Sequence, residues 1–182
     1  MRQTPSPVLL PVALLLACWI TPAASAQVAA TKSRVVVNLG TSNITSAGGT
    51  WGGNMSKTKA GVFIHGEATG SGSVGDKDLN VDLSCETFLD FVLAVGPENA
   101  TTQVRLVLRD LDGTEVAWNV TLAGMQPQVP KEVHLEIDKP DAILAPGTEP
   151  GFNRKSVDYW RIEGDGSENA AQLLLMQVRA GH

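Results

Sequence analysis

The stretch TQVRLVLRDLDGTEVAWNVTL, residues 102–122, decides the fold class. It holds two runs in which apolar and polar residues alternate, Thr102–Arg109 and Thr114–Leu122, and Asp110–Gly113 lies between them. Alternation with period two is typical of half-buried β-strands. Asp and Gly favour a tight turn, because they tolerate the backbone angles that such a turn requires. The stretch therefore predicts a β-hairpin.

Short apolar runs of the same kind recur on both sides of this hairpin, and Gly, Pro, Asn and Asp separate them. No stretch after residue 26 has a helical period. This pattern predicts an all-β protein, an antiparallel β-sandwich (jelly roll) of about eight or nine strands. The other strands are expected at Arg34–Leu39, Gly61–Glu67, Asn80–Leu83, Phe88–Val95, Lys131–Ile137, Val157–Glu163 and Gln172–Arg179. Loops are expected at Gly48–Lys59, Ala68–Gly75 and Ala142–Arg154.

The first residues have the pattern of an export signal. Arg2 is the only charge before Lys32, the apolar run Val8–Ile20 follows, and Ala24–Ala26 matches the A-x-A cleavage pattern. The apolar run is shorter than the roughly 20 residues that span a bilayer, so no transmembrane segment is expected. We therefore expect a signal peptide at 1–26, a single β-sandwich domain at 27–182, and a secreted or periplasmic protein.

The two cysteines bear on anchoring and on stability. Leu15–Cys18 resembles the lipobox of bacterial lipoproteins, so a lipid anchor at Cys18 is the alternative to soluble export. Cleavage after Ala26 leaves 156 residues with Cys85 as the only cysteine, which cannot form an internal disulfide. A chain of about 150 residues buries enough apolar surface without one. Cys85 itself is interpreted as a half-buried strand or turn residue.

The charge balance argues against one class of partner. The chain carries 14 Lys and Arg against 19 Asp and Glu, for a formal net charge of −5, and it has no basic cluster. Nucleic-acid binding depends on Lys and Arg that neutralise phosphates. We therefore expect no nucleic-acid partner.

Alternation also assigns side chains to the two faces of each strand. Val116, Trp118 and Val120 share one face of their strand, and Trp160 shares a face with Ile162, so both tryptophans are expected in the core. The opposite faces are polar. If these strands lie side by side, they form a surface of guanidinium, carboxylate and tyrosine groups suited to a hydroxyl-rich ligand. The candidate ligand-binding residues are Arg105, Arg109, Asn119, His134, Glu136, Tyr159 and Arg161. The alternative is an ordinary solvated sheet face.

Oxygen-bearing side chains alternate along residues 76–82. An EF-hand loop starting at Asp76 would need Gly at its sixth position and Glu at its twelfth, where this chain has Val81 and Thr87. The EF-hand interpretation therefore fails. A different structural Ca²⁺ site with Asp76, Asp78 and Asp82 as ligands remains a hypothesis, beside that of a solvated acidic turn. No other cofactor is predicted.

Catalytic motifs are missing from the sequence. It contains no histidine or cysteine pair with zinc spacing, no nucleophile elbow and no phosphate-binding loop. An enzyme would need a cleft with convergent titratable groups, for which His65, Glu67 and Arg105 are candidates. A non-catalytic protein is the prediction.

The stretch from Leu83 to Val178 resembles the galactose-binding-like β-sandwich of carbohydrate-binding modules in secreted bacterial proteins. The resemblance rests on a strand that enters Val95–Asn99, the hairpin with Trp118 in its second arm, and three later segments. These segments are Leu135–Pro140, Pro150–Phe152 and Val157–Asp165. It implies a jelly roll of two antiparallel sheets, a glycan bound on a sheet face or at loop tips, and in many members a structural Ca²⁺.

Together these observations predict an exported, non-catalytic β-sandwich module that binds a poly- or oligosaccharide through a polar sheet face. Two alternatives stay open at this point. One is a structural or protein-interaction module of the cell envelope or matrix, with an envelope protein as its partner. The other is a jelly-roll enzyme that degrades polysaccharides.

Overall fold

The computed structural model describes residues 32–182. The expected export signal, its cleavage site and Cys18 lie outside the described residues. Within 32–182, the chain forms twelve β-strands and one short 3₁₀ helix, η1 (Arg154–Ser156). The strands are β1 (Ser33–Asn38), β2 (Thr45–Gly49), β3 (Met55–Thr58), β4 (Gly61–Ile64), β5 (Gly72–Asp76), β6 (Phe88–Val95), β7 (Gln103–Asp110), β8 (Glu115–Thr121), β9 (Lys131–Glu136), β10 (Ala142–Ala145), β11 (Val157–Gly164) and β12 (Leu173–Gly181). The described part contains no helix that is long and apolar enough to cross a membrane.

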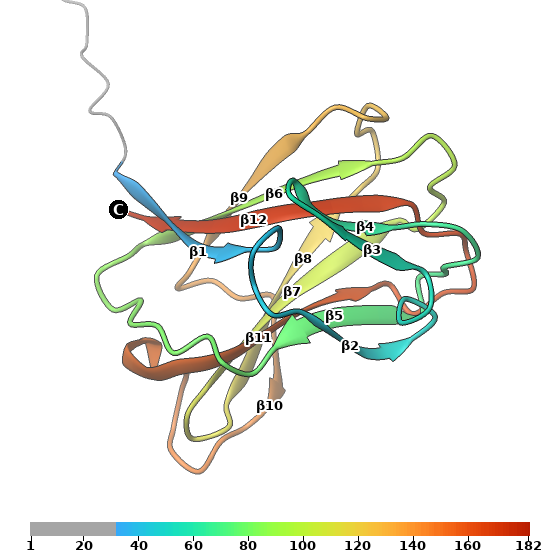
Figure 1. Cartoon of the computed structure of the whole chain (residues 1–182). Coiled ribbons are helices and arrows are strands. Elements are labelled where there is room, and N and C mark those ends of the chain that lie inside the picture. Colours follow the sequence, from blue (N-terminus) through green and yellow to red (C-terminus); the bar gives the residue numbers. More distant parts are fainter. Residues whose placement is uncertain (1–31) are drawn as a thin grey trace, which may run out of the picture. The chain divides into compact units, whose positions relative to one another are not determined.

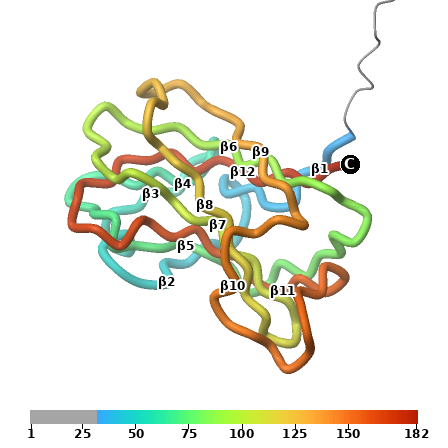
Figure 2. Tube along the Cα trace, turned by 180° about the vertical axis from the view of Figure 1, so that it is seen from behind, coloured from blue at the N-terminus to red at the C-terminus, as the bar shows by residue number. Residues whose placement is uncertain are grey.

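The strands form two antiparallel sheets that face each other (Figures 1 and 2). The first, called the β12 sheet, has the order β3-β4-β12-β6-β9, and β1 pairs with the far half of β12. The second, called the β7 sheet, has the order β10-β8-β7-β11-β5-β2. The predicted antiparallel β-sandwich is therefore confirmed, with more strands than the sequence predicted.

The core lies between the two sheets and takes one face of each strand. In β8, Val116, Trp118 and Val120 are 1%, 2% and 1% exposed, as their alternation predicts. Trp160 and Ile162 of β11 are buried in the same way. One apolar cluster includes residues from both sheets, so the two layers share a single core. Burial of each large apolar side chain contributes roughly 1.5–3 kcal/mol to stability.

Several segments expected to be loops are strands. β3 lies in the expected loop 48–59, most of β5 lies in 68–75, and β10 lies in 142–154. β3 (MSKT) and β5 (GSVGD) consist mostly of small or polar residues, and β10 (AILA) is a short run without alternation, so none of them gives an alternating apolar signal. The expected strand Asn80–Leu83 is instead a segment outside the regular strands that makes one bridge, between Val81 and Val157.

Two residues in turns have a degree of burial that the sequence did not indicate. Trp51 lies in a turn, but its side chain is fully buried, and its indole N–H donates to the backbone oxygen of Thr69 at 2.8 Å. Cys85 lies in a turn as expected but is exposed, where half-burial was predicted. The burial of Trp51 follows from its packing against Thr69 and Gly72, a contact that the local sequence does not reveal.

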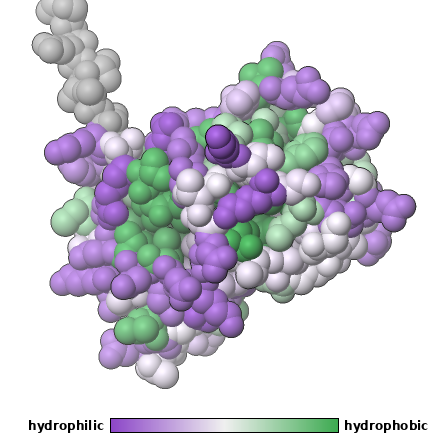
Figure 3. Space-filling model, viewed as in Figure 1, coloured by the Kyte–Doolittle hydropathy of each residue, from purple (hydrophilic) through white to green (hydrophobic). Residues whose placement is uncertain are grey.

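A mixed surface covers this sandwich. Figure 3 shows apolar residues in separate patches with polar side chains between them. Four large apolar side chains in the described part are well exposed, Val35, Leu111, Val129 and Ile143, and they belong to different segments. Scattered residues of this kind are normal on a soluble surface. The polar faces of the two sheets are therefore the more informative surfaces.

Candidate ligand-binding face

The outer face of the β7 sheet gathers five of the seven predicted ligand-binding residues. β7 pairs with β8 on one side and with β11 on the other. This register puts Asn119, Arg105 and Glu163 in one row across the three strands. A second row contains Arg109 and Tyr159, opposite each other on β7 and β11. Arg161 of β11 lies between these two rows. We call the outward side chains of β7, β8 and β11 the polar face.

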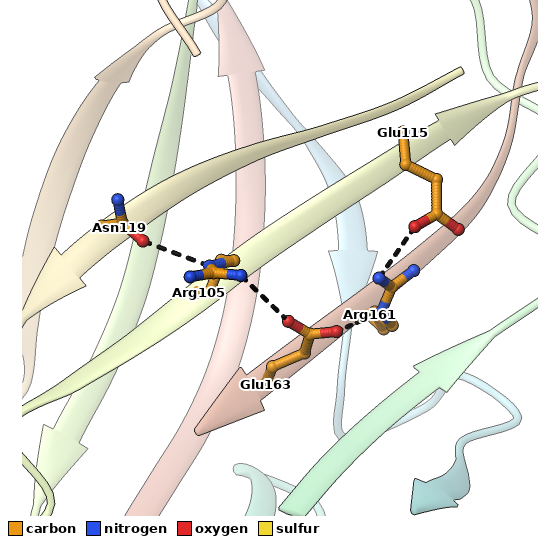
Figure 4. A network of polar contacts seen from close by, with 5 residues as sticks. All are labelled: Arg105, Glu115, Asn119, Arg161 and Glu163. Atoms are coloured by element: carbon orange, nitrogen blue, oxygen red, sulfur yellow. Dashed lines mark hydrogen bonds and ion pairs between the residues drawn. The ribbon is translucent and has the colours of Figure 1, made fainter. Parts of the chain in front are cut away.

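The guanidinium groups of the polar face are held by carboxylates (Figure 4). Arg161 donates to Glu115 at 2.8 Å and to Glu163 at 2.6 Å. Arg105 reaches the other oxygen of Glu163 at 3.8 Å and donates to the Asn119 amide oxygen at 3.2 Å. The chain of contacts joins β7, β8 and β11 through their side chains, in addition to the backbone ladder.

Arg161 is the most enclosed cation of this network, because only 15% of its side chain is exposed. Burial alone would favour the neutral form, but the hydrogen bonds to Glu115 and Glu163 outweigh it and raise the pKa of Arg161 above its ordinary value. Beneath these groups, Val107 and Ala117 occupy the same face and are fully buried. The polar side chains therefore cover a small apolar layer with their methylene stems.

Tyr159 is the aromatic group of the polar face. The guanidinium carbon of Arg109 lies 4.8 Å from the centre of its ring, and that of Arg161 lies 5.7 Å from it. Arg109 is fixed in turn by Asp158, with contacts of 3.1 and 3.4 Å. Attraction between each cation and the ring holds the ring in place.

The polar face is bordered by a hollow on the side of β5 and β2. The hollow has a volume of about 260 Å³ and is lined mainly by glycine and serine residues, with Glu163 in its wall. Gly75 pairs with Arg161, and a Cβ on Gly75 would come within 2.8 Å of the Arg161 Cβ. The glycines therefore add no side chains to the edge of the polar face beside the charged network.

His134 and Glu136 do not belong to the polar face. They lie on β9, which pairs with β6 in the β12 sheet, the opposite layer of the sandwich. The condition under which the seven residues would form one surface, that their strands lie side by side, is therefore not met by β9. Alternation fixes which face of a strand is polar but not the sheet to which the strand belongs. His65, whose ring stacks on Phe63 of β4, is likewise in the layer opposite Arg105, so the enzyme cleft considered for them does not form.

The three aspartates proposed as Ca²⁺ ligands do not form a cluster. Within residues 32–182, no group of three or more His, Cys, Asp or Glu side chains is arranged to hold a metal ion. Asp76 accepts a hydrogen bond from the backbone N–H of Asp78, and Asp82 accepts one from that of Ser84. The bond from Ser84 lowers the pKa of Asp82. These carboxylates stabilise turns.

Three acidic residues of the polar face were not among the predicted ligand-binding residues. Glu115 and Glu163 follow the same alternation as their arginine partners, so the pattern that found the arginines could have found them. Asp158 could not be found this way. The pairing of β11 with β7 shifts between Val157 and Tyr159, which breaks strict alternation and lets Asp158 reach Arg109.

Comparison with solved structures finds the same architecture in carbohydrate-binding modules. The family 11 carbohydrate-binding module of the cellulosomal cellulase Lic26A-Cel5E of Clostridium thermocellum is similar at TM-score 0.58 and 12% identity, over 85% of this chain and 97% of that chain. A xylan-binding module, CBM15, is similar at TM-score 0.57 and 12% identity, over 83% and 96%. The family 11 module in complex with a β-1,3-1,4-mixed-linked tetrasaccharide gives TM-score 0.50 and 10% identity, over 82% and 86%.

These structures define the class of fold to which the chain is similar. The resemblance to the β-sandwich of carbohydrate-binding modules is confirmed at the level of the fold. No protein-family model matches the sequence, and a search of curated proteins also finds no match. The ligand of this chain must therefore be argued from its own side chains.

Proposed function

We propose that this chain is an exported, non-catalytic module that binds a neutral poly- or oligosaccharide on the polar face of the β7 sheet. The observation that carries the proposal is Tyr159, a partly exposed ring steadied by Arg109 and Arg161 in the middle of a dense set of hydrogen-bonding groups. An aromatic ring packs against the apolar face of a sugar, and paired charged groups exchange hydrogen bonds with its hydroxyls.

The charge balance of the polar face favours a neutral ligand. Three arginines are matched by three carboxylates, Glu115, Asp158 and Glu163, and each arginine contacts at least one of them. A polyanion would have to displace a carboxylate from its guanidinium partner, and that costs the existing ion pair. A hydroxyl-rich neutral chain can add its hydrogen bonds without breaking these pairs.

The same pairing supports a non-catalytic role. Glycoside hydrolysis needs one carboxylic acid that can protonate the leaving group and a second carboxylate free to act as base or nucleophile. Glu115 and Glu163 are both engaged by Arg161, at 2.8 and 2.6 Å. Both carboxylates are occupied as hydrogen-bond acceptors of one guanidinium group, which suits recognition better than catalysis. The export of the module is proposed from the leader-like residues 1–26.

Binding to mixed-linked β-1,3-1,4-glucan and to xylan, measured by affinity electrophoresis and calorimetry, tests the proposal. We expect Tyr159→Ala to weaken binding by about tenfold, which corresponds to about 1.4 kcal/mol. Tyr159→Phe keeps the ring and should bind nearly as well as the wild type. Leu111→Ala, on the exposed β7–β8 turn, is the control for an unrelated surface change.

Two results would count against this function. If Tyr159→Ala binds as tightly as the wild type with an unchanged melting temperature, the polar face is not the site. If the folded wild type binds no glycan in a broad panel, the carbohydrate proposal is wrong. Cross-linking to an envelope protein would then support the interaction module instead.

A further inference from the structure

The β12 sheet carries its own hollow on the face turned away from the core. It is lined by Ser33, Phe88, Asp90, Glu132, His134 and Arg179, from β1, β6, β9 and β12, and has a volume of about 390 Å³. Volumes of roughly 300–1,000 Å³ are typical of sites for small ligands. The register places Arg179, Asp90 and His134 in one row across β12, β6 and β9. We call this hollow the His134 cavity.

Asp90 forms the polar floor of the His134 cavity. The residue is 9% exposed, and its Oδ1 lies 2.8 Å from Nδ1 of His134. Among residues 32–182, its other carboxylate oxygen has no hydrogen-bond partner. The described residues contain no fully buried polar side-chain atom that lacks a hydrogen-bond partner. Since this oxygen lacks one, it is not fully buried. It is therefore an acceptor that faces the cavity.

His134 forms a fixed aromatic wall. Its ring lies on the ring of Phe88, with centres 4.7 Å apart and planes 35° apart, while Nδ1 is bound to Asp90. The side chain is nevertheless 60% exposed. Because two contacts hold the imidazole, one ring face and Nε2 are presented outward with little rotamer entropy left to lose on binding.

The charges around the cavity select the kind of ligand. Arg179 is paired with Glu132 at 3.0 Å, and Asp90 is paired with His134. An anionic ligand would have to compete with Glu132 for Arg179, whereas hydroxyl groups can meet the free Asp90 oxygen, Nε2 of His134 and the Ser33 hydroxyl together. The flat face of the imidazole can also pack against the apolar face of one sugar ring.

We propose that the His134 cavity is a second binding site for a neutral sugar, on the face of the sandwich opposite the polar face. The two sites lie on opposite layers, whose sheets pack about 10 Å apart. One chain can then hold two polysaccharide strands at once and cross-link them. Cross-linking by one chain depends on the proposed function of the polar face, whereas sugar binding in the His134 cavity does not.

Calorimetry and turbidity with the full chain test this proposal. The probes are a β-1,3-1,4-mixed-linked tetrasaccharide and the soluble mixed-linked glucan polymer. We expect the wild type to bind two tetrasaccharides and to make the polymer turbid. His134→Ala should bind one and leave the polymer clear. Because the change also removes the hydrogen bond to Asp90 and the contact with Phe88, circular dichroism checks that the variant is folded at the temperature of the assay. The imidazole resonances of His134 should shift when the tetrasaccharide is added.

His65→Ala is the matched control, because it also removes an imidazole that stacks on a phenylalanine of the β12 sheet. It should keep both sites. If His134→Ala still binds two tetrasaccharides, or if the wild type binds only one and loses it in Tyr159→Ala, the second site is refuted while the proposed function stands. Loss of all binding in His134→Ala alone refutes the polar face and supports the cavity. No binding of either probe overturns both.

Discussion

Asp165 shows how a single carboxylate closes a loop beside the polar face. It follows the end of β11 and accepts hydrogen bonds from the backbone N–H and hydroxyl of Thr102, at 2.8 and 3.2 Å. It also accepts bonds from the backbone N–H and hydroxyl of Ser167, at 3.0 and 2.6 Å. Partial burial opposes ionisation, but these four bonds outweigh it and lower the pKa of Asp165 below 3.8. The start of β7 is thereby tied to the loop after β11.

Asp165→Asn should make the protein less stable at neutral pH and change its acid response. An Asp whose pKa is lowered by folding adds stability above its unfolded pKa of 3.8, and this is lost as the pH falls below that value. We expect the variant to lose about 1–2 kcal/mol at pH 7, because hydrogen bonds to a charged group are the stronger ones. Urea unfolding at pH 7, 4 and 3 measures both effects. A difference between variant and wild type that does not shrink below pH 4 would contradict the mechanism.

At the scale of single strands, alternation in the sequence predicts more than their positions. The inward sets of β8 and β11, with Trp118 and Trp160, are buried as predicted, and the outward arginines meet on one surface. β8, and β11 from Tyr159 onward, alternate regularly, so their period can be recognised in the sequence. Alternation therefore put the candidate binding residues on the outward faces of their strands, and the pairing of β7, β8 and β11 brings five of the seven together on one surface.

The strands that the sequence did not reveal share a physical cause. β2 (TSAGG) and β5 (GSVGD) are built from small residues, which carry almost no hydrophobic period. Their ladders form because neighbouring strands offer backbone partners and because Trp51 packs beneath them. The assignment of β9 to the β12 sheet has a similar origin, since pairing across 40 residues depends on the whole topology. Local pattern cannot contain that information.

Gly72 at the start of β5 gives the clearest test of this close packing. A Cβ at that position would lie 1.9 Å from the ring of Trp51, which is fully buried and cannot move aside freely. We expect Gly72→Ala to cost roughly 1–3 kcal/mol, the usual range for overpacking. Chemical unfolding monitored by circular dichroism measures it.

Gly53→Ala is the matched control for Gly72→Ala. A Cβ at Gly53 meets nothing within 4 Å, so this change should be neutral or slightly stabilising. If the two alanine variants unfold at the same urea concentration, the contact between Trp51 and β5 is looser than the structure indicates.

At the scale of the whole molecule, the inner faces of the two sheets form the core, and their outer faces carry the proposed binding sites. Their inner faces share one apolar cluster that includes Trp51, Trp118 and Trp160, so neither sheet has a core of its own. Their outer faces carry two sets of polar groups, the polar face and the His134 cavity. A ligand on either outer face therefore touches side chains that are not part of the shared core.

This division predicts how the domain unfolds. Because Trp51, Trp118 and Trp160 are 0%, 2% and 1% exposed and belong to one core, their fluorescence should shift to the red in a single step that coincides with the loss of β-sheet circular dichroism. Trp19 lies outside the described residues, so the measurement uses a chain that starts at Gln27. Acrylamide should quench the native emission only weakly. Two separate transitions, or a native emission already shifted to the red, would mean that the sheets do not share one core. A stable intermediate with one sheet melted would then carry only one of the two proposed sites.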